Sequence, residues 1–224
     1  MSPFGSSFRT ILGTAGVSAV QTFPTVAATA VESFVSGLGA NPSVDLPAGI
    51  VANDLIILFG STGNDGEFSG VPSGFTLLFD TGVAGGLDFR GWYKVAAGGE
   101  TAVTVNRTVD RHCSFISYRI SGYQGTPEAA VATPSKDPPN LSPSWGSAKT
   151  LWLAGVGDEN DDPATAGPTG FSGFLQTGTG GAANGNQTAT ASKQEEVASQ
   201  NPGAFTIPAT ESIWAAATVA IRPA

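Results

Sequence analysis

The sequence predicts an all-β protein: a jelly-roll-like β-sandwich built from two pseudo-repeats and preceded by an N-terminal arm. Three observations support this fold class. Thirty glycines and 15 prolines accompany only 12% charged residues, a composition typical of many short strands joined by turns. Short apolar runs alternate with glycine- and aspartate-containing turns along the chain. One pattern of strand, acidic loop and turn occurs twice.

The repeated pattern is spaced by 96 residues, from residue 54 to residue 150. Residues 54–82 align with residues 150–178 without a gap, and both contain an apolar run followed by a Pro-x-Gly-Phe turn. Continuing the alignment requires a six-residue insertion in the second copy and then one further residue. The aligned pairs include Leu55 with Leu151, Pro72 with Pro168, Phe75 with Phe171, Val95 with Val197 and Ile116 with Val219. We interpret the chain as a duplicated half-domain, with pseudo-repeats at about residues 43–122 and 140–224.

Residues 1–24 precede the repeats and are interpreted as an arm, so the sandwich is expected over residues 25–224. The arm has little charge and lacks a period of two or of 3.6 residues. Two interpretations stay open: the arm packs along its own domain, or it binds another chain, which we take as the prediction. The candidate assembly contacts are Phe4, Phe8, Ile11 and Leu12.

The strands of the sandwich are expected from residue 26 onward. Residues 55–59 are apolar at every position, which predicts a central strand covered on both faces, because a strand wetted on one face alternates. The five prolines between residues 122 and 146 predict a linker that crosses between the halves of one sandwich. The other strands are expected at residues 26–35, 43–46, 76–79, 89–95, 102–105, 113–120, 151–156, 173–176, 189–197, 204–207 and 213–221.

The charge balance limits the partners. Ten Lys and Arg against 18 Asp and Glu give a net charge of -8, so the surface should repel nucleic acid and anionic membranes. No segment is long and apolar enough to span a membrane. A single cysteine excludes an intrachain disulfide, so the fold must be held by packing or by partner chains.

Catalytic equipment is sparse. His112 and Cys113 are the only residues of their kinds, and adjacent residues on a strand point to opposite faces, which argues against a nucleophile and base pair. No serine lies in a Gly-x-Ser-x-Gly elbow. A glycan-degrading enzyme with two facing carboxylates is the remaining catalytic alternative. The sequence therefore predicts a protein that is not an enzyme.

An acidic loop follows the central strand in both repeats. Asp158, Asp161 and Asp162 lie in the second copy, where the first copy has Asn64 and Asp65. Calcium prefers such carboxylate and amide oxygens, so the three aspartates are the candidate metal ligands. The alternative is a solvated acidic loop, the commoner meaning of such a run. No other cofactor is expected.

Tryptophan side chains are the candidates for stacking on sugars. Trp92 and Trp145 are the predicted glycan contacts, whereas Trp152 and Trp214 lie within apolar runs and are expected in the core. An exposed pair would fit a host-surface glycan.

Four motifs resemble a β-sandwich module of structural proteins from tailed bacteriophages. They are LPAGIVANDLIIL at residues 46–58, PSGFTLL at 72–78, YKVAAGGET at 93–101 and YRISG at 118–122. The resemblance implies a place on the virion, as a head decoration, a head fibre or spike, or a tail accessory protein. It implies as partners other virion proteins and copies of the same chain. The arm lies outside the resemblance.

The sequence thus favours a non-enzymatic virion structural protein that assembles through subunit contacts and touches the host surface. A carbohydrate-binding adhesin module, with or without calcium, is the alternative function.

Overall fold

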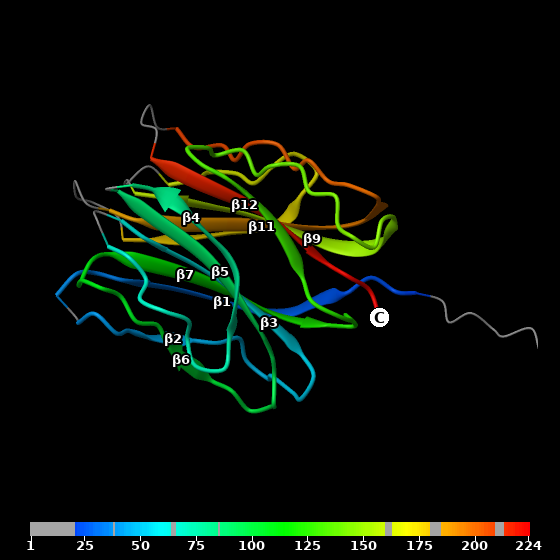
Figure 1. The fold of residues 1–224 in the computed structure, drawn as a ribbon, viewed down its shortest axis with the longest axis horizontal. Helices are drawn as coiled ribbons and strands as arrows, with labels where there is room; N and C mark the ends of the chain where they lie inside the picture. The colour runs from blue at the N-terminus through cyan, green and yellow to red at the C-terminus, as the bar shows by residue number, and fades with distance from the viewer. Residues whose placement is uncertain are drawn as a thin grey trace, which may run out of the picture.

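A computed structural model describes residues 21–37, 39–63, 66–84, 86–159, 163–179, 185–208 and 213–224. Within these ranges the chain forms strands and no helix, so no helix there could cross a membrane (Figure 1). The all-β prediction is confirmed. The strands are β1 (Thr25–Phe34), β2 (Ser43–Asp45), β3 (Leu55–Thr62), β4 (Thr76–Val83), β5 (Leu87–Val95), β6 (Ala102–Thr104), β7 (Cys113–Ser121), β8 (Glu128–Ala132), β9 (Ala148–Asp158), β10 (Ser172–Gly178), β11 (Gln187–Val197) and β12 (Trp214–Ile221).

The strands form two antiparallel five-stranded sheets and one small two-stranded sheet. The first half of the chain builds the sheet β1-β7-β3-β5-β4, and the second half builds β8-β12-β9-β11-β10. Strands β2 and β6 pair separately. In chain order, β1, β3, β4, β5 and β7 correspond to β8, β9, β10, β11 and β12. The two repeats therefore have the same strand order, as the duplication predicts.

The recurring Pro-x-Gly-Phe motif forms the same turn in both repeats. The backbone nitrogen of Phe75 donates to the oxygen of Pro72 at 3.0 Å, and Phe171 donates to Pro168 at 3.1 Å. Gly74 has φ of 77° and Gly170 has φ of 82°, a left-handed conformation that glycine adopts at little cost. The glycine is therefore required by the backbone of this turn.

The two sheets pack face to face as a sandwich, with β3 against β9 at the centre. Strand β1 packs on β10 at one side, and β4 packs on β8 at the other. Strand β1 thus lies over the duplicate of β4, and β4 lies over the duplicate of β1. This arrangement relates the two repeats by a pseudo-two-fold axis. The chain crosses between the sheets between β7 and β8.

The segment predicted as a linker contains a strand. Strand β8 pairs with β12 from Glu128 to Ala132, so residues 122–146 are more than a crossing. Alanine dominates β8, and a short alanine-rich segment between prolines gives no strand signal in the sequence. The expected strand at residues 204–207 contributes only an isolated bridge, between Ala166 and Thr206.

The alignment of the later strands needs correction. Leu55 pairs with Val95, but its counterpart Leu151 pairs with Gln194 rather than with Val197. A shift of three residues exchanges the two faces of a strand, so the alignment by sequence was wrong there. Alternating small and apolar residues match almost equally well in several registers, which explains the error. In the last strand, the pairing equates Ile116 with Ala217 and Ile120 with Ile221.

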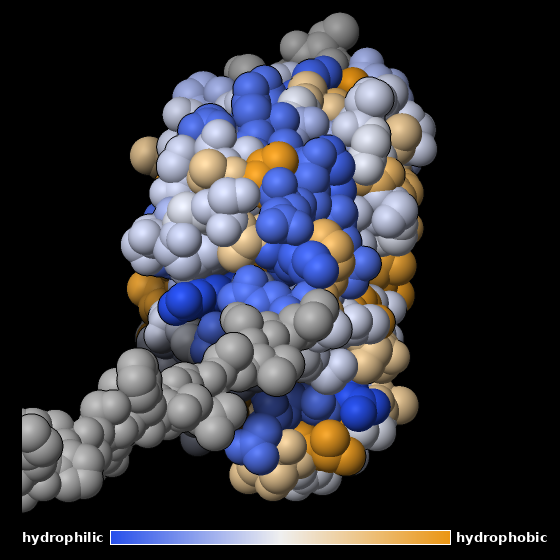
Figure 2. All heavy atoms as spheres, turned by 90° about the vertical axis from the view of Figure 1, so that its right-hand side faces the viewer, coloured by the Kyte–Doolittle hydropathy of each residue, from blue (hydrophilic) through white to orange (hydrophobic). Residues whose placement is uncertain are grey.

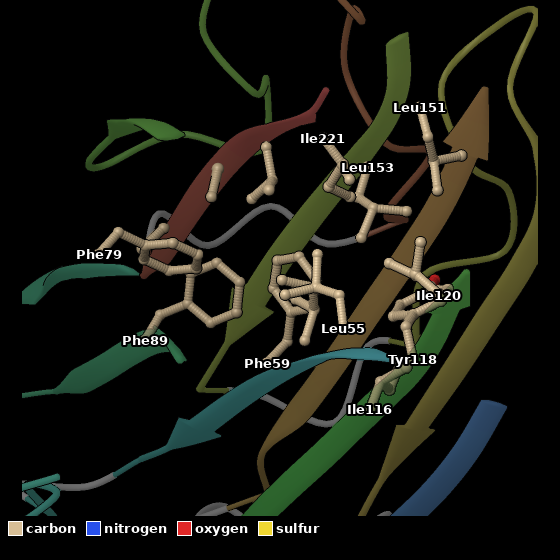
Figure 3. Packing of buried hydrophobic residues seen from close by; sticks show 14 of the residues in the cluster. Leu55, Phe59, Phe79, Phe89, Ile116, Tyr118, Ile120, Leu151, Leu153 and Ile221 are labelled. Atoms are coloured by element: carbon tan, nitrogen blue, oxygen red, sulfur yellow. The ribbon is translucent and has the colours of Figure 1, made fainter. Parts of the chain in front are cut away.

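The core between the sheets combines aromatic and aliphatic side chains of the first repeat with aliphatic side chains of the second (Figure 3). Phe59 and Phe89 are fully buried and stack with ring centroids 6.2 Å apart. Opposite them lie Gly155 and Gly157, where an added Cβ would approach the two rings to within 3 Å. The sheets therefore approach closely where the second repeat has no side chain.

The outer face of each sheet is also covered. Strands β2 and β6 lie over Ile56 and Leu58, which point away from the inter-sheet core. On the other sheet, Phe205 and Leu141, from segments outside the strands, pack over β9. Residues 55–59 are therefore buried on both faces, which confirms the prediction of a doubly covered central strand.

Candidate functional site

Loops of both repeats meet at one end of the sandwich, which we call the loop end. It contains Gly63, Gly86, Glu159 and Ile213. Glu159, just after β9, donates its backbone N–H to the oxygen of Ile213 at 3.3 Å. Gly63, just after β3, lies so close to Glu159 that an added Cβ would stand 3.0 Å from its Cγ. A Cβ added to Gly86, in the turn between β4 and β5, would lie 3.0 Å from Cγ2 of Ile213. Segments far apart in the sequence thus form one surface here (Figure 1).

A buried polar network lies beneath the loop end, between the sheets. Ser61 Oγ lies 2.8 Å from Thr188 Oγ1 and 3.1 Å from Ser114 Oγ. Both serine hydroxyls donate to Asn186 Oδ1, at 3.0 Å and 2.8 Å. Asn186 Nδ2 in turn donates to the backbone oxygen of Asp158 at 3.2 Å. The network joins β3, β7 and β9 to the start of β11, and satisfied buried networks of this kind specify one arrangement of a core.

The predicted metal ligand Asp158 is the last residue of β9 and is fully buried. Its Oδ2 accepts a hydrogen bond from Gln187 Nε2 at 2.9 Å, and Gln187 Oε1 accepts the N–H of Ala164 at 2.8 Å. Residues alternate between faces along a strand, so Asp158 shares the face of Ala154 and Val156. Its carboxylate is therefore buried on the outer face of the second sheet and does not lie between the two sheets. Asp161 and Asp162 lie outside the described residues, as do Asn64 and Asp65. The described part of the chain holds no group of three His, Cys, Asp or Glu side chains that could bind a metal, and calcium stays a prediction.

A pocket of about 270 Å³ lies beside the turn between β4 and β5. Its charged lining residues are Glu67, Asp80, Asp88 and Arg90. Arg90 Nε lies 3.1 Å from Oδ1 of both Asp80 and Asp88, so one guanidinium bridges two carboxylates. Three carboxylates against one cation leave the pocket with negative charge.

Asp88 is the most perturbed carboxyl group of this pocket. Burial raises its pKa to about 6, although the N–H of Phe68 and the guanidinium of Arg90 both favour the ionised form. Asp88 Oδ2 accepts the Phe68 N–H at 2.8 Å, and Oδ1 accepts Arg90 Nε. Both oxygens are engaged within the protein, so the geometry fits a structural tie between β5 and the segment before β4.

The two predicted glycan contacts differ in their surroundings. Trp92 is fully buried beneath β2 and β6, with its ring edge-on to Phe68 at 5.1 Å between centroids. The prediction that Trp92 offers a sugar-stacking face is therefore wrong, because the small sheet covers that side. Trp145 is half-buried, and its Nε1 donates to Thr150 Oγ1 at 3.2 Å. Its glycan contact stays a prediction.

The two remaining tryptophans also differ. Trp152 lies in the core with no exposed surface, as predicted. Trp214 is only partly buried, and the Lys136 ammonium lies 5.2 Å from the centre of its ring.

The single histidine and the single cysteine of the sequence lie at the start of β7. The backbone oxygen of His112 accepts a hydrogen bond from Thr62 Oγ1 at 3.0 Å. Cys113 is fully buried, and burial raises the pKa of its thiol to about 12. A thiol with this pKa is protonated at neutral pH and is a poor nucleophile.

Sequence reasoning missed the Asp80–Arg90–Asp88 bridge and the hydroxyl network. Asp88 and Arg90 are two apart on a strand and so share a face, which was an available signal. Ser61, Ser114 and Thr188 gave no signal, because hydroxyl residues are common throughout the chain. The predicted assembly contacts Phe4, Phe8, Ile11 and Leu12 lie outside the described residues.

No known protein family, curated protein or solved structure matches this chain.

Proposed function

We propose that this chain is a non-enzymatic structural protein of a bacteriophage virion, either a head decoration or fibre or a tail accessory protein. Its sandwich would be attached through the N-terminal side and would present the loop end outward. The observation that supports this orientation is the separation of the two features: the first described residues and the loop end lie at opposite ends of the sandwich (Figure 1).

The attachment end contains residues 21–24 and the last residue of the chain. Lys149 Nζ donates to the oxygen of Gln21 at 3.0 Å, and Gln194 Nε2 donates to the oxygen of Pro24 at 2.8 Å. The N–H of Ala224 donates to the oxygen of Gly122 at 3.1 Å at the same end. Figure 2 views this end, where polar residues predominate and apolar ones are scattered. Both hydrogen bonds to residues 21–24 come from the second sheet, so the fold fixes where these four residues lie.

The chemistry of the loop end favours a structural role. Two buried carboxyl groups at this end, those of Asp88 and Asp158, are held by Phe68, Arg90 and Gln187. Groups tied in this way position backbone segments and are poorly placed to transfer protons to a substrate. The resemblance of four motifs to virion sandwich modules supports a place on a particle.

Particle incorporation tests the proposal. Removing residues 2–20, or replacing Phe4, Phe8, Ile11 and Leu12 together by serine, should leave a folded sandwich that no longer co-sediments with particles of the encoding phage. The matched control is Val51→Ser with Val71→Ser, two valines of the sandwich that are 54% and 47% exposed. The control protein should be incorporated normally. Normal incorporation of the arm variants, or the absence of the unaltered chain from purified particles, would contradict the proposal.

A further inference from the structure

The two main sheets have four edge strands, β1 and β4 in one and β8 and β10 in the other. An edge strand presents unpaired N–H and C=O groups that can pair with another chain. Proteins usually prevent this pairing with short edges, prolines, bulges or charged side chains. The protection of each edge therefore indicates whether that edge stays unpaired or pairs with another chain.

Three of the four edges carry such protection. Strand β8 has only five residues and lies between Pro127 and Pro134. The pairing of β4 with β5 is interrupted by an irregularity between Leu77 and Phe79. Strand β10 has a corresponding irregularity after Ser172, next to a glycine in the left-handed conformation. These devices shorten or twist the edges and discourage pairing.

Strand β1 is the longest of the four edges, and its protection, Pro24 and one irregularity, is confined to its beginning. It is ten residues long, contains no proline or glycine, and carries one charged side chain, Glu32. Its pairing with β7 is irregular only between Val26 and Ala28, and the register is unbroken from there to Phe34. Within the described residues β1 pairs with β7 alone, so its other edge has no partner there.

Strand β8, the duplicate of β1, occupies the equivalent edge of the second sheet and differs from β1 in its protection. Val31 pairs with Ile116 in the first sheet, and Val131 pairs with Ala217 at the equivalent place in the second. Val31 is 48% exposed and Val131 is 40% exposed. The two halves thus share the position of the edge strand, and a proline precedes it in both, Pro24 and Pro127. Only the second half shortened the strand and follows it with another proline, Pro134.

We propose that the free edge of β1 pairs with β1 of a second copy, antiparallel and across a two-fold axis, so that two five-stranded sheets join into one of ten strands. The side chains of β1 are compatible with such self-pairing. With the axis at Ala30, Glu32 lies opposite Ala28, so the two carboxylates do not face each other. Although the chain has a net charge of -8, the only charged side chain of β1 is Glu32, whose carboxylate accepts the N–H of Asp45 at 2.7 Å. Few like charges therefore meet along the paired strands themselves. The pairing does not depend on the proposed virion role.

Mass measurement across a concentration series tests the pairing. The full chain should form dimers, and Val31→Lys should raise the dimer dissociation constant at least tenfold while the melting temperature stays within a few degrees. Val131→Lys, the matched change on β8, should leave the dimer intact. A full chain that is monomeric at hundreds of micromolar, or equal weakening by both substitutions, would overturn the proposal. Dimers that appear only after removal of residues 1–20 would also overturn it, because the chain's own N-terminal segment would then cover the edge.

Cysteine cross-linking provides a second, independent readout. Single substitutions Thr29→Cys, Ala30→Cys and Val31→Cys place a thiol near the proposed axis, and at least one should form an interchain disulfide under mild oxidation. Val131→Cys should remain uncross-linked. The native Cys113 is fully buried and should not compete. Failure of all three β1 variants to cross-link, or equal cross-linking of Val131→Cys, would contradict the pairing.

Discussion

Phe59 and Gly155 occupy the same position in the two repeats and face each other across the centre of the sandwich. A Cβ on Gly155 would lie 2.8 Å from Phe59 Cε1. The duplicated strands have therefore diverged into a large and a small partner, which lets the sheets approach without a void.

The substitution Gly155→Ala should destabilise the protein. The added methyl group overpacks the core, which typically costs about 1–3 kcal/mol in the free energy of unfolding. Combining it with Phe59→Leu should cost less than the sum of the two single changes, because the smaller side chain leaves room for the methyl group. Urea unfolding of the four proteins measures this coupling. Strict additivity would show that the two residues do not pack against each other.

The hydroxyl network predicts a cost for removing one member. Ser61→Ala leaves Asn186 and Thr188 with fewer partners in a buried site. Such a loss should lower the free energy of unfolding by about 1–3 kcal/mol. Ser73→Ala, at an exposed serine in the turn before β4, should change it by less than about 0.5 kcal/mol. Chemical denaturation compares the two variants, and equal effects would argue against the network.

The raised pKa of Asp88 predicts a pH dependence. A carboxyl group whose pKa rises from 3.8 in the unfolded chain to about 6 in the folded protein binds more protons when folded, so stability falls as pH rises between these values. The loss at neutral pH amounts to as much as about 3 kcal/mol for this group. Asp88→Asn should flatten the melting temperature between pH 4 and pH 6 relative to the unaltered protein. An unchanged slope in the variant would show that Asp88 does not titrate in this window.

The burial of Trp92 predicts a stability effect in place of a binding effect. Trp92→Ala should lower the free energy of unfolding by about 3–5 kcal/mol, because it opens a cavity beneath β2 and β6. Trp145→Ala, at a half-buried tryptophan, should cost clearly less. Thermal unfolding with both variants checks this order, and a folded, fully stable Trp92→Ala protein would contradict the core assignment.

The sequence predicted well where its signal was local. Residues 55–59 are apolar at every position because both faces of β3 are covered, and Gly74 and Gly170 recur because their turn needs a left-handed residue. The prediction failed where a residue's burial or pairing depends on strands that are distant in the sequence. We predicted an exposed Trp92 because no residue near it in the sequence indicates that the distant strands β2 and β6 cover it. The sequence could not indicate β8 either, since pairing with β12 creates that strand.

We propose that the sandwich sits on a virion with its loop end outward. A cryo-electron microscopy map of the intact particle of the proposed phage tests this orientation most directly. We predict density for the sandwich on the outer surface, with residues 21–24 and Ala224 toward the particle and the turn between β4 and β5 toward solvent. A particle without this chain, or a sandwich with its loop end against the particle, would contradict the account.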